Sequence, residues 1–442
     1  MKKYIKNITR TLGKLPLRGL VGCLGLLLFA SSCQQQEYLN PSAASETQVV
    51  SDANGLITLA NGIQYRFSAN GGVYAMISAN GLTTKELLVL NAGNTDLDLL
   101  GKGAGNVQGN NAFVTSLWAQ CHLTKSNADI ILKNINNVQD AGVKSGLVAY
   151  ASIFRALALG TLAEFWERAP IGTGENITFD SRDDVLKEAI KTLENAATVL
   201  AANAPTSTFT SRVANSVDMA NTVQALIARY SLMLGDNDKA LAAANKVDLT
   251  KKSAFAYDDV TQNPVFFSSF GNRNVTEPTG IALGLPDAIK PDARDKRMGF
   301  YTQTAAPAKN LGTGFFTANT AQIPVYLPGE ITLIKAEALA RKGTIDDAIA
   351  ELNKVLTKTT DVWGIGAALP AYTGDKTATA VLTEIYKNRC IELFMSGLRL
   401  EDSRRFGRPA AGTATAERNR NWYPYPLNER QNNTSTPTDP AL

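Results

Sequence analysis

The sequence predicts an all-α protein in which a scaffold of helix hairpins carries a loop-rich inserted lobe. Three observations lead to this prediction. Residues 228–247 and 336–355 repeat one pattern, in which a helix ends at a Gly, an Ala follows five residues later and an Asn ten residues later. Other long stretches place apolar residues at helical spacing. Residues 250–325 lack that spacing and are rich in Asn, Gly, Pro and aromatic residues.

The repeated segments are typical of tetratricopeptide-like helix hairpins, because small side chains let two helices approach closely and Gly forms the turn. The matching positions are Gly235, Ala240 and Asn245 in the first segment and Gly343, Ala348 and Asn353 in the second. A continuous array would repeat every 34 residues or so. These segments start 108 residues apart, so we interpret residues 250–325 as an insertion over the helical scaffold.

Further helices are expected before the first hairpin, at residues 48–67, 113–138, 144–166 and 181–202. Ser181 is the expected N-cap of the last one, with Asp183 and Asp184 in its first turn. Pro170 follows the end of the helix at 144–166, as expected for a residue that cannot continue a helix. Residues 68–112 are rich in Gly and Asn and are expected to be mostly loops.

The N-terminus predicts export. Residues 1–32 hold six basic residues and no acidic ones, and residues 20–30 form an apolar stretch of eleven residues. A membrane-spanning helix needs about 20 apolar residues, so this stretch has the length of a secretory signal. We therefore expect residues 1–32 to be a lipoprotein signal peptide, 33–45 a flexible tether and 46–442 a single domain. Within that domain the scaffold is expected at about 46–250 and 326–442, and the ligand lobe at about 250–325.

Cys33 is the expected lipidation site. Ala30, Ser31 and Ser32 precede it, and small residues before a cysteine resemble a lipobox, in which the thiol is acylated. The polar residues 34–37 suit a tether. The alternative is an ordinary signal peptide with an incidental Cys33, because lipoboxes usually carry Leu where this chain has Ala30.

Composition excludes several functional classes. Without the six basic residues of positions 1–32 the chain has 38 basic and 40 acidic residues, a net charge of about −2, so nucleic-acid binding is not expected. A single His122 argues against a metal site built on imidazoles. We expect no metal site and no cofactor. Cys121 and Cys390 are expected to be free buried thiols, although a disulfide between them stays open.

The C-terminal part resembles the SusD/RagB family of outer-membrane nutrient-binding lipoproteins. Residues 388–409 fit the approximate family pattern R-x-x-E-L, G-x-R, D-x-x-R-x-G, and residues 422–433 resemble its closing YPIP-x-x-E-x-x-x-N. Weaker likeness extends over residues 37–67 and 149–171. Met395 and Ser396 depart from the pattern, which usually has an aromatic and then an acidic residue there. The matching positions are Arg389, Glu392, Leu393, Gly397, Arg399, Asp402, Arg405, Gly407, Tyr423, Pro424, Pro426, Glu429 and Asn433.

The resemblance implies a surface-exposed, lipid-anchored protein of the outer membrane. Such a protein binds oligosaccharide or peptide and delivers it to a SusC-like TonB-dependent transporter. It uses no cofactor and is not an enzyme. Two alternatives stay open: a lipid-anchored helical-repeat scaffold that binds proteins, and a surface glycoside hydrolase, although GxSxG, P-loop and HExxH motifs are all missing. No catalytic residues are assigned.

Candidate ligand-binding residues come from composition alone, because flat sugar faces stack on aromatic rings. They lie in loops, where binding sites concentrate. The competing interpretation is that these rings only fill a small hydrophobic cluster. The candidates are Phe266, Phe267, Phe270 and Tyr301 in the lobe, and Trp363 and Tyr372 in a second Gly-rich loop.

Two further sets of residues are expected to be structural. The Arg-rich run is interpreted as structural rather than as a phosphate site. Glu392, Arg399, Asp402 and Arg405 can form ion pairs and bind carbonyl groups within one helix-turn segment, and Arg favours such bidentate pairing. Trp118 and Trp166 lie on apolar helix faces and are expected in the core.

Overall fold

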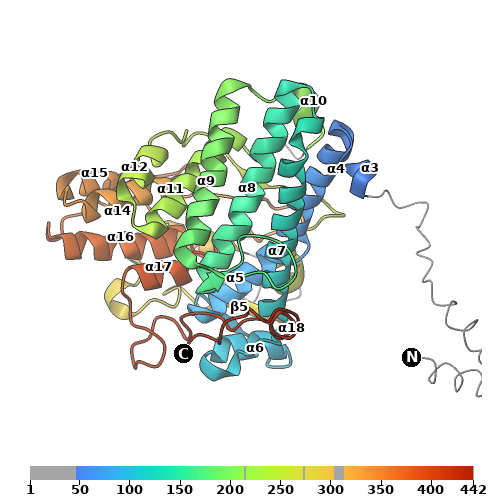
Figure 1. The fold of residues 1–442 in the computed structure, drawn as a ribbon. Helices are drawn as coiled ribbons and strands as arrows, with labels where there is room; N and C mark the ends of the chain where they lie inside the picture. Colours follow the sequence, from blue (N-terminus) through green and yellow to red (C-terminus); the bar gives the residue numbers. More distant parts are fainter. Residues whose placement is uncertain (1–45, 214–215, 272–273, 303–312, 442) are drawn as a thin grey trace, which may run out of the picture. The chain divides into compact units, whose positions relative to one another are not determined.

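The computed structural model describes residues 46–213, 216–271, 274–302 and 313–441. The predictions for the signal peptide, for the tether at 33–45 and for Cys33 lie outside these residues. Residues 47–442 form one compact unit with its own core. Figure 1 shows a fold dominated by helices, and the predicted all-α class is confirmed.

The principal helices are α3 (Glu46–Val49), α4 (Ala53–Gln64), α5 (Gly72–Thr83), α6 (Thr95–Lys102), α7 (Ala112–Lys133), α8 (Ala141–Phe165), α9 (Arg182–Ala202), α10 (Ser207–Thr210), α11 (Met219–Leu234), α12 (Asn237–Ala244), α13 (Arg297–Tyr301), α14 (Pro328–Arg341), α15 (Ile345–Leu356), α16 (Ala378–Glu392), α17 (Arg399–Arg405) and α18 (Leu427–Asn432). The short strands are β1 (Leu87–Val89), β2 (Arg168–Ala169), β3 (Asp180–Ser181), β4 (Ala254–Phe255), β5 (Thr276–Pro278) and β6 (Ile323–Pro324). They form three antiparallel pairs, β1 with β5, β2 with β3 and β4 with β6.

Helix α8 is the centre of the core. It lies between α7 and α9 (Figure 1), and nearly all of its side chains are buried. By length and composition it is the one helix of the described residues that could cross a membrane, but its most hydropathic part is completely buried inside the protein. A helix that is apolar all round suits the interior of a large domain. The predicted cap of the next helix is confirmed, because the Ser181 hydroxyl accepts a hydrogen bond from the backbone N–H of Asp184.

The predicted hairpins are formed by α11 with α12 and by α14 with α15. Gly235 and Gly343 end the first helix of each with φ of 79° and 85°, a left-handed conformation that favours glycine. Helix α12 packs against α14, and α9 packs against α11. The hairpins are therefore stacked directly on one another although a long insertion separates them in the sequence.

Two short ladders and one buried side chain fix the inserted lobe. Strand β4 pairs with β6 near the two ends of the insertion, and β5 pairs with β1 from the N-terminal part. Asn263, which is fully buried, donates through its amide to the carbonyl oxygens of Phe315 (3.0 Å) and Ala321 (2.8 Å). The loop conformation is thus held by hydrogen bonds rather than by long regular elements.

The prediction of loops at residues 68–112 is wrong, because this stretch contains α5, β1 and α6. Its Gly, Asn, Ser and Thr residues have low helix propensity. Burial nevertheless stabilises α5, most of whose side chains are buried. The hydroxyls of Thr83 and Tyr423 are hydrogen-bonded at 2.7 Å, so the C-terminal segment helps to hold this helix in place.

The Arg-rich run is structural, as predicted, but only part of the predicted pairing is present, because Glu392 pairs with Arg297 (3.1 Å) and Lys358 instead of with an arginine of the run. Arg389 forms a bidentate pair with Asp402 (2.8 and 3.0 Å), and Asp402 also accepts from Arg405 (2.6 Å). Arg399 donates to the carbonyl oxygens of Leu283 and Gly284 in the lobe. The predicted core positions of Trp118 and Trp166 are also confirmed, since both are buried.

Candidate functional site

The aromatic run Phe266–Phe270 forms a single π-helical turn, and this geometry sends its rings in different directions. Phe267 is 60% exposed, Phe266 is half-buried, and Phe270 is buried against Phe316 with 6.1 Å between ring centroids. Among the predicted residues of this turn, Phe267 thus offers a ring to solvent and Phe270 does not.

Tyr301 lies in the core. It is 2% exposed, its hydroxyl donates to the backbone carbonyl oxygen of Glu392 at 2.6 Å, and its ring packs edge-on against Phe394. Burial raises the pKa of the Tyr301 phenol well above its ordinary value. In this structure Tyr301 connects the lobe to the scaffold and presents no surface to a ligand.

Trp363 and Tyr372 do not form a shared platform. Trp363 is half-buried against Phe315, and the Lys252 ammonium lies 4.7 Å from the centre of its ring. Tyr372 packs instead on the cluster of α14 to α16, and its hydroxyl donates to the carbonyl oxygen of Asp375. The structure therefore separates the two residues that proximity in sequence had grouped together.

A polar cleft with an exposed aromatic ring lies where the end of α4 meets the lobe. Its volume is about 250 Å³. Tyr65 is 52% exposed at this cleft. Its lining is otherwise mostly polar, as follows: Asn61, Gln64, Ser68, Ala256, Tyr257, Asp258 and Thr261.

Hydrogen bonds orient the polar groups of the cleft and leave others available. The Tyr150 hydroxyl donates to Gln64 Oε1 at 2.5 Å, which leaves the Gln64 Nε2 protons as donors. Asn61 Nδ2 donates to the carbonyl oxygen of Arg212 at 2.8 Å, which leaves Asn61 Oδ1 as an acceptor. Asp258 Oδ1 accepts from the backbone N–H of Thr261, which leaves Asp258 Oδ2 as an acceptor. Oriented donors and acceptors beside an exposed ring suit a polyhydroxylated ligand.

Sequence reasoning missed Tyr65, although a signal was available. The buried residues of this helix lie at positions 56, 57, 60, 63 and 64, and Phe67 continues the same face. Tyr65 lies off that face, so its ring has no place in the core. A large aromatic residue outside the apolar face of an amphipathic helix is a better indicator of a surface platform than an aromatic cluster in a loop.

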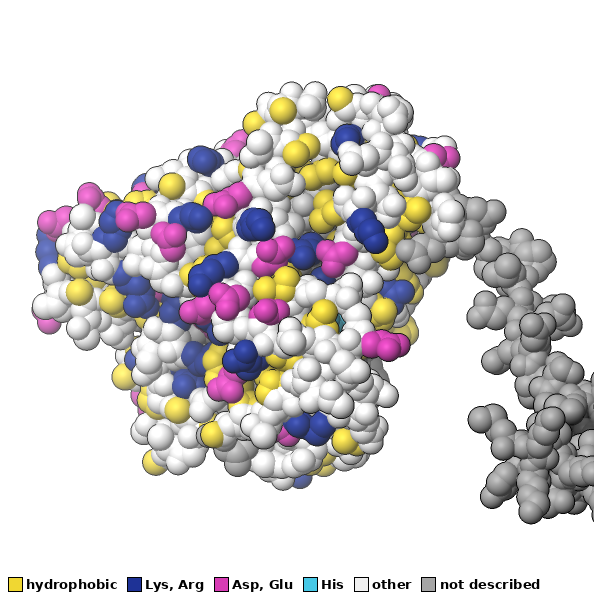
Figure 2. All heavy atoms as spheres, viewed as in Figure 1, with side chains coloured by type: hydrophobic (Ala, Val, Ile, Leu, Met, Phe, Trp, Pro, Cys, Tyr) yellow, Lys and Arg dark blue, Asp and Glu magenta, His cyan; other side chains and the backbone are white. Residues whose placement is uncertain are grey.

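Metal chemistry has no support among the described residues, where no group of three or more His, Cys, Asp or Glu side chains could hold an ion. His122 packs on Trp118 with 4.5 Å between ring centroids, and burial lowers its pKa well below the ordinary value. The imidazole is therefore neutral and structural. On the face shown in Figure 2, acidic and basic side chains are interspersed, with no large surface of one sign.

A family model matches the C-terminal half of the chain. Residues 234–440 match the model of the SusD family. The resemblance seen in the sequence is thereby confirmed. A search of curated proteins finds no match. The SusD match covers α12, the second hairpin, the whole lobe and the Arg-rich run.

Solved structures share the SusD-like fold over most of the chain. A SusD superfamily protein from Bacteroides fragilis aligns with a TM-score of 0.67 and 16% identity, over 88% of this chain and 99% of the other. A SusD superfamily protein from Bacteroides vulgatus ATCC 8482 aligns with a TM-score of 0.67 and 18% identity, over the same shares. A SusD-like carbohydrate binding protein from Bacteroides fragilis NCTC 9343 aligns with a TM-score of 0.64 and 15% identity, over 88% of this chain and 99% of the other.

Proposed function

We propose that this SusD-like protein captures a nutrient oligosaccharide at the cell surface and passes it to a TonB-dependent transporter of the outer membrane. Acylated Cys33 is the proposed anchor. The observation that carries the proposal is the exposed Tyr65 ring beside the polar cleft, on a fold shared with a SusD-like carbohydrate binding protein. A peptide ligand is the second candidate of the same class.

The chemistry of the cleft favours a sugar. A pyranose ring presents C–H groups on one face and hydroxyls at its edge. The Tyr65 ring would receive the C–H face, while Asn61, Gln64 and Asp258 would exchange hydrogen bonds with the hydroxyls. Phe267, the exposed ring of the lobe, is a second proposed contact for a longer chain. In this proposal the cleft binds the sugar and catalyses no reaction on it, so the protein is not an enzyme.

Binding is tested with an array of glycans and peptides, followed by titration calorimetry on each positive. We expect an oligosaccharide to bind and Tyr65→Ala to weaken its binding about 5- to 150-fold, because a stacked aromatic ring contributes about 1–3 kcal/mol in base-stacking sites. Ile281→Ala, at another residue that is 68% exposed, is the matched control and should bind as the parent does.

Three outcomes separate the alternatives. Loss of binding in Tyr65→Ala, with an unchanged unfolding midpoint, supports the proposed site. Glycan binding that is unaffected by Tyr65→Ala and by Phe267→Ala would keep the function and refute the site. Failure of every glycan and peptide to bind would refute nutrient capture and favour a protein-binding scaffold.

Anchoring and partnership have their own test. Metabolic labelling with an alkyne fatty acid should tag the parent chain and not Cys33→Ala. The parent should also fractionate with outer membranes and co-purify with a TonB-dependent barrel. An unlabelled chain recovered in the soluble fraction would refute the anchored role.

A further inference from the structure

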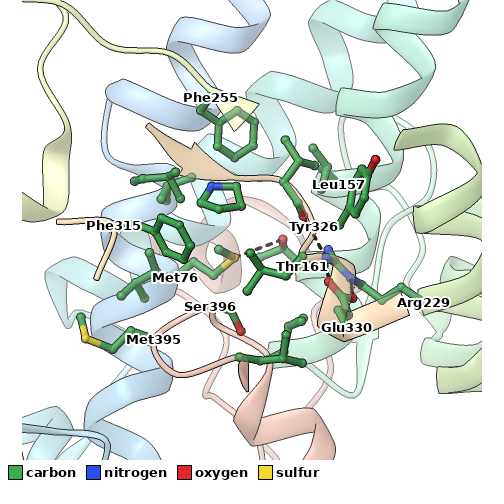
Figure 3. Close-up of a pocket in the computed structure, with 18 of the residues that line it drawn as sticks. Met76, Leu157, Thr161, Arg229, Phe255, Phe315, Tyr326, Glu330, Met395 and Ser396 are labelled. Atoms are coloured by element: carbon green, nitrogen blue, oxygen red, sulfur yellow. Dashed lines mark hydrogen bonds and ion pairs between the residues drawn. The ribbon is translucent and has the colours of Figure 1, made fainter. Parts of the chain in front are cut away.

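A small cavity lies between the helical scaffold and the inserted lobe. Its volume is about 60 Å³, and the surrounding elements are α5, α8, α11, β4, β6, α14 and the turn after α16. Figure 3 shows Phe255 and Phe315 on one side of this space and Thr161 beside it. Much of the wall is aromatic, since Phe67, Tyr230 and others line it as well. The cavity is distinct from the Tyr65 cleft, with which it shares no lining residue.

One carboxylate in the wall of the cavity has no partner. Glu164 is 4% exposed, and its side chain makes no hydrogen bond or ion pair with any described residue. The other carboxylate, Glu330, is paired with Arg229 through two hydrogen bonds of 2.6 and 2.7 Å. That pair neutralises itself, so ionised Glu164 leaves the cavity with a net charge of −1. Ionisation of a buried carboxyl without a partner is costly, so a bound cation would stabilise the ionised form of Glu164.

Two hydroxyls in the same wall also lack partners among the described residues. Ser396 Oγ and the Tyr326 hydroxyl are both buried without a hydrogen bond. Ser396 follows Met395, which has a φ of 58°, a backbone conformation that costs a residue with a side chain about 1–2 kcal/mol. Met395 and Ser396 are also the positions at which the sequence departs from the SusD pattern. Strain of this kind is concentrated at ligand sites and switch regions.

We propose that this cavity binds a small monovalent cation of the ammonium type, such as ammonium or methylammonium. The Glu164 carboxylate would balance its charge, and the oxygens of Ser396 and Thr161 would accept N–H hydrogen bonds. Aromatic faces such as those of Phe255 and Phe315 attract cations through their quadrupole. This binding is independent of the nutrient role.

Size and charge exclude sugars, anions and divalent metals. A cavity of about 150 Å³ is needed to hold benzene, so a sugar ring does not fit into about 60 Å³. An anion would meet the uncompensated Glu164 carboxylate. A divalent metal would need several oxygen ligands at short range, and no such cluster exists among the described residues.

The charges around Glu164 predict a dependence on pH. Burial raises the Glu164 pKa to about 8, Arg229 and Arg404 lower it, and Glu401 and Asp402 raise it further. The carboxyl is therefore protonated in acid and becomes a full counterion only in mild alkali. Cation binding should be at least tenfold tighter at pH 9 than at pH 6, because the carboxyl is almost fully protonated at the lower pH.

The test uses methylammonium chloride as the probe, with sodium chloride at equal ionic strength as background. Saturation-transfer NMR on the methyl signal reports binding to the purified protein, and methanol serves as the neutral probe with the same number of heavy atoms. We expect saturable methylammonium binding at pH 9 that is at least tenfold weaker in Glu164→Gln. Glu175→Gln removes the same charge from an exposed position and should bind as the parent does.

Thermal unfolding shows whether each variant is still folded. Glu164→Gln preserves shape and removes a buried charge, so its unfolding midpoint without ligand should be equal to or above that of the parent. If a well-folded parent shows no saturable signal at pH 9, or if Glu164→Gln binds as tightly as the parent, the proposal is wrong. Equal binding of methanol and methylammonium would also overturn it, because the site would then select size and not charge.

Discussion

Arg297 is the residue whose loss should most weaken the attachment of the lobe to the scaffold. Its side chain is fully buried and donates to Asp295 (3.0 and 2.7 Å), to Glu392 (3.1 Å) and to Asn388 (2.8 Å). Asp295 belongs to the lobe, whereas Glu392 and Asn388 belong to α16. Arg297→Met keeps most of the side-chain volume and removes the charge. The buried carboxylates of Asp295 and Glu392 would then each lose an ion-pair partner.

Removal of one member of a buried ion pair costs about 3–5 kcal/mol. The unfolding entropy is about 2.1 cal/mol/K per residue, so a unit of roughly 400 residues should lose about 4–6 °C in its unfolding midpoint. Urea unfolding monitored by circular dichroism measures the free energy, and calorimetry measures the midpoint.

Arg294→Met is the matched control from the same loop. Arg294 pairs with Asp292 at 2.7 Å, but its side chain is 68% exposed, so its loss should cost less than about 1 kcal/mol. Equal losses in the two variants would refute the reasoning, because burial would then not govern the cost of removing the charge.

Three more predictions concern the core. Gly160→Ala should lower the unfolding free energy by about 1–3 kcal/mol, because the added Cβ would lie 2.3 Å from the Tyr230 ring. Chemical denaturation measures this free energy, and an unchanged midpoint would contradict the prediction. Glu164 should make the free energy of unfolding fall by about 1.4 kcal/mol per pH unit between its unfolded pKa and the folded pKa of about 8, because the native state holds a proton that the unfolded chain has released. Glu164→Gln should remove this contribution to the slope. An identical slope in that variant would contradict the prediction. Cys121 and Cys390 are both free and buried, and burial raises the pKa of the Cys390 thiol to about 12. A thiol reagent should therefore label them only after the protein unfolds. Rapid labelling of the native protein would disprove their burial.

Local sequence signals were sufficient for the helical scaffold. Ser181 caps its helix through its own hydroxyl, and Gly235 and Gly343 end theirs because glycine adopts positive φ without strain. Such signals act within one turn of the backbone and do not need the rest of the molecule. The Arg-rich run was predicted only in part, since Asp402 and Arg405 pair one helical turn apart, whereas Glu392 pairs with Arg297, a residue of the lobe that lies far away in sequence.

Helix α5 shows where local signals fail. Its residues are poor helix formers, and only burial against the surrounding elements makes the helix stable. The sequence predicts free thiols at Cys121 and Cys390 but leaves a disulfide between them open. The structure decides this point, because both cysteines are unpaired.

The candidate site depended almost wholly on the tertiary structure. Composition identified aromatic residues in loops, but the π-helical turn exposes Phe267 and buries Phe270, three residues further on. Whether a ring faces solvent depends on contacts made by residues far away in sequence, such as that of Phe270 with Phe316. The sequence alone determined the helical class and the hairpins, because these follow from periodicity and turn chemistry. It also carried the family resemblance, which rests on residue motifs. The tertiary structure decided which aromatic rings are exposed and which charges are left without partners, because burial is a property of the packed chain.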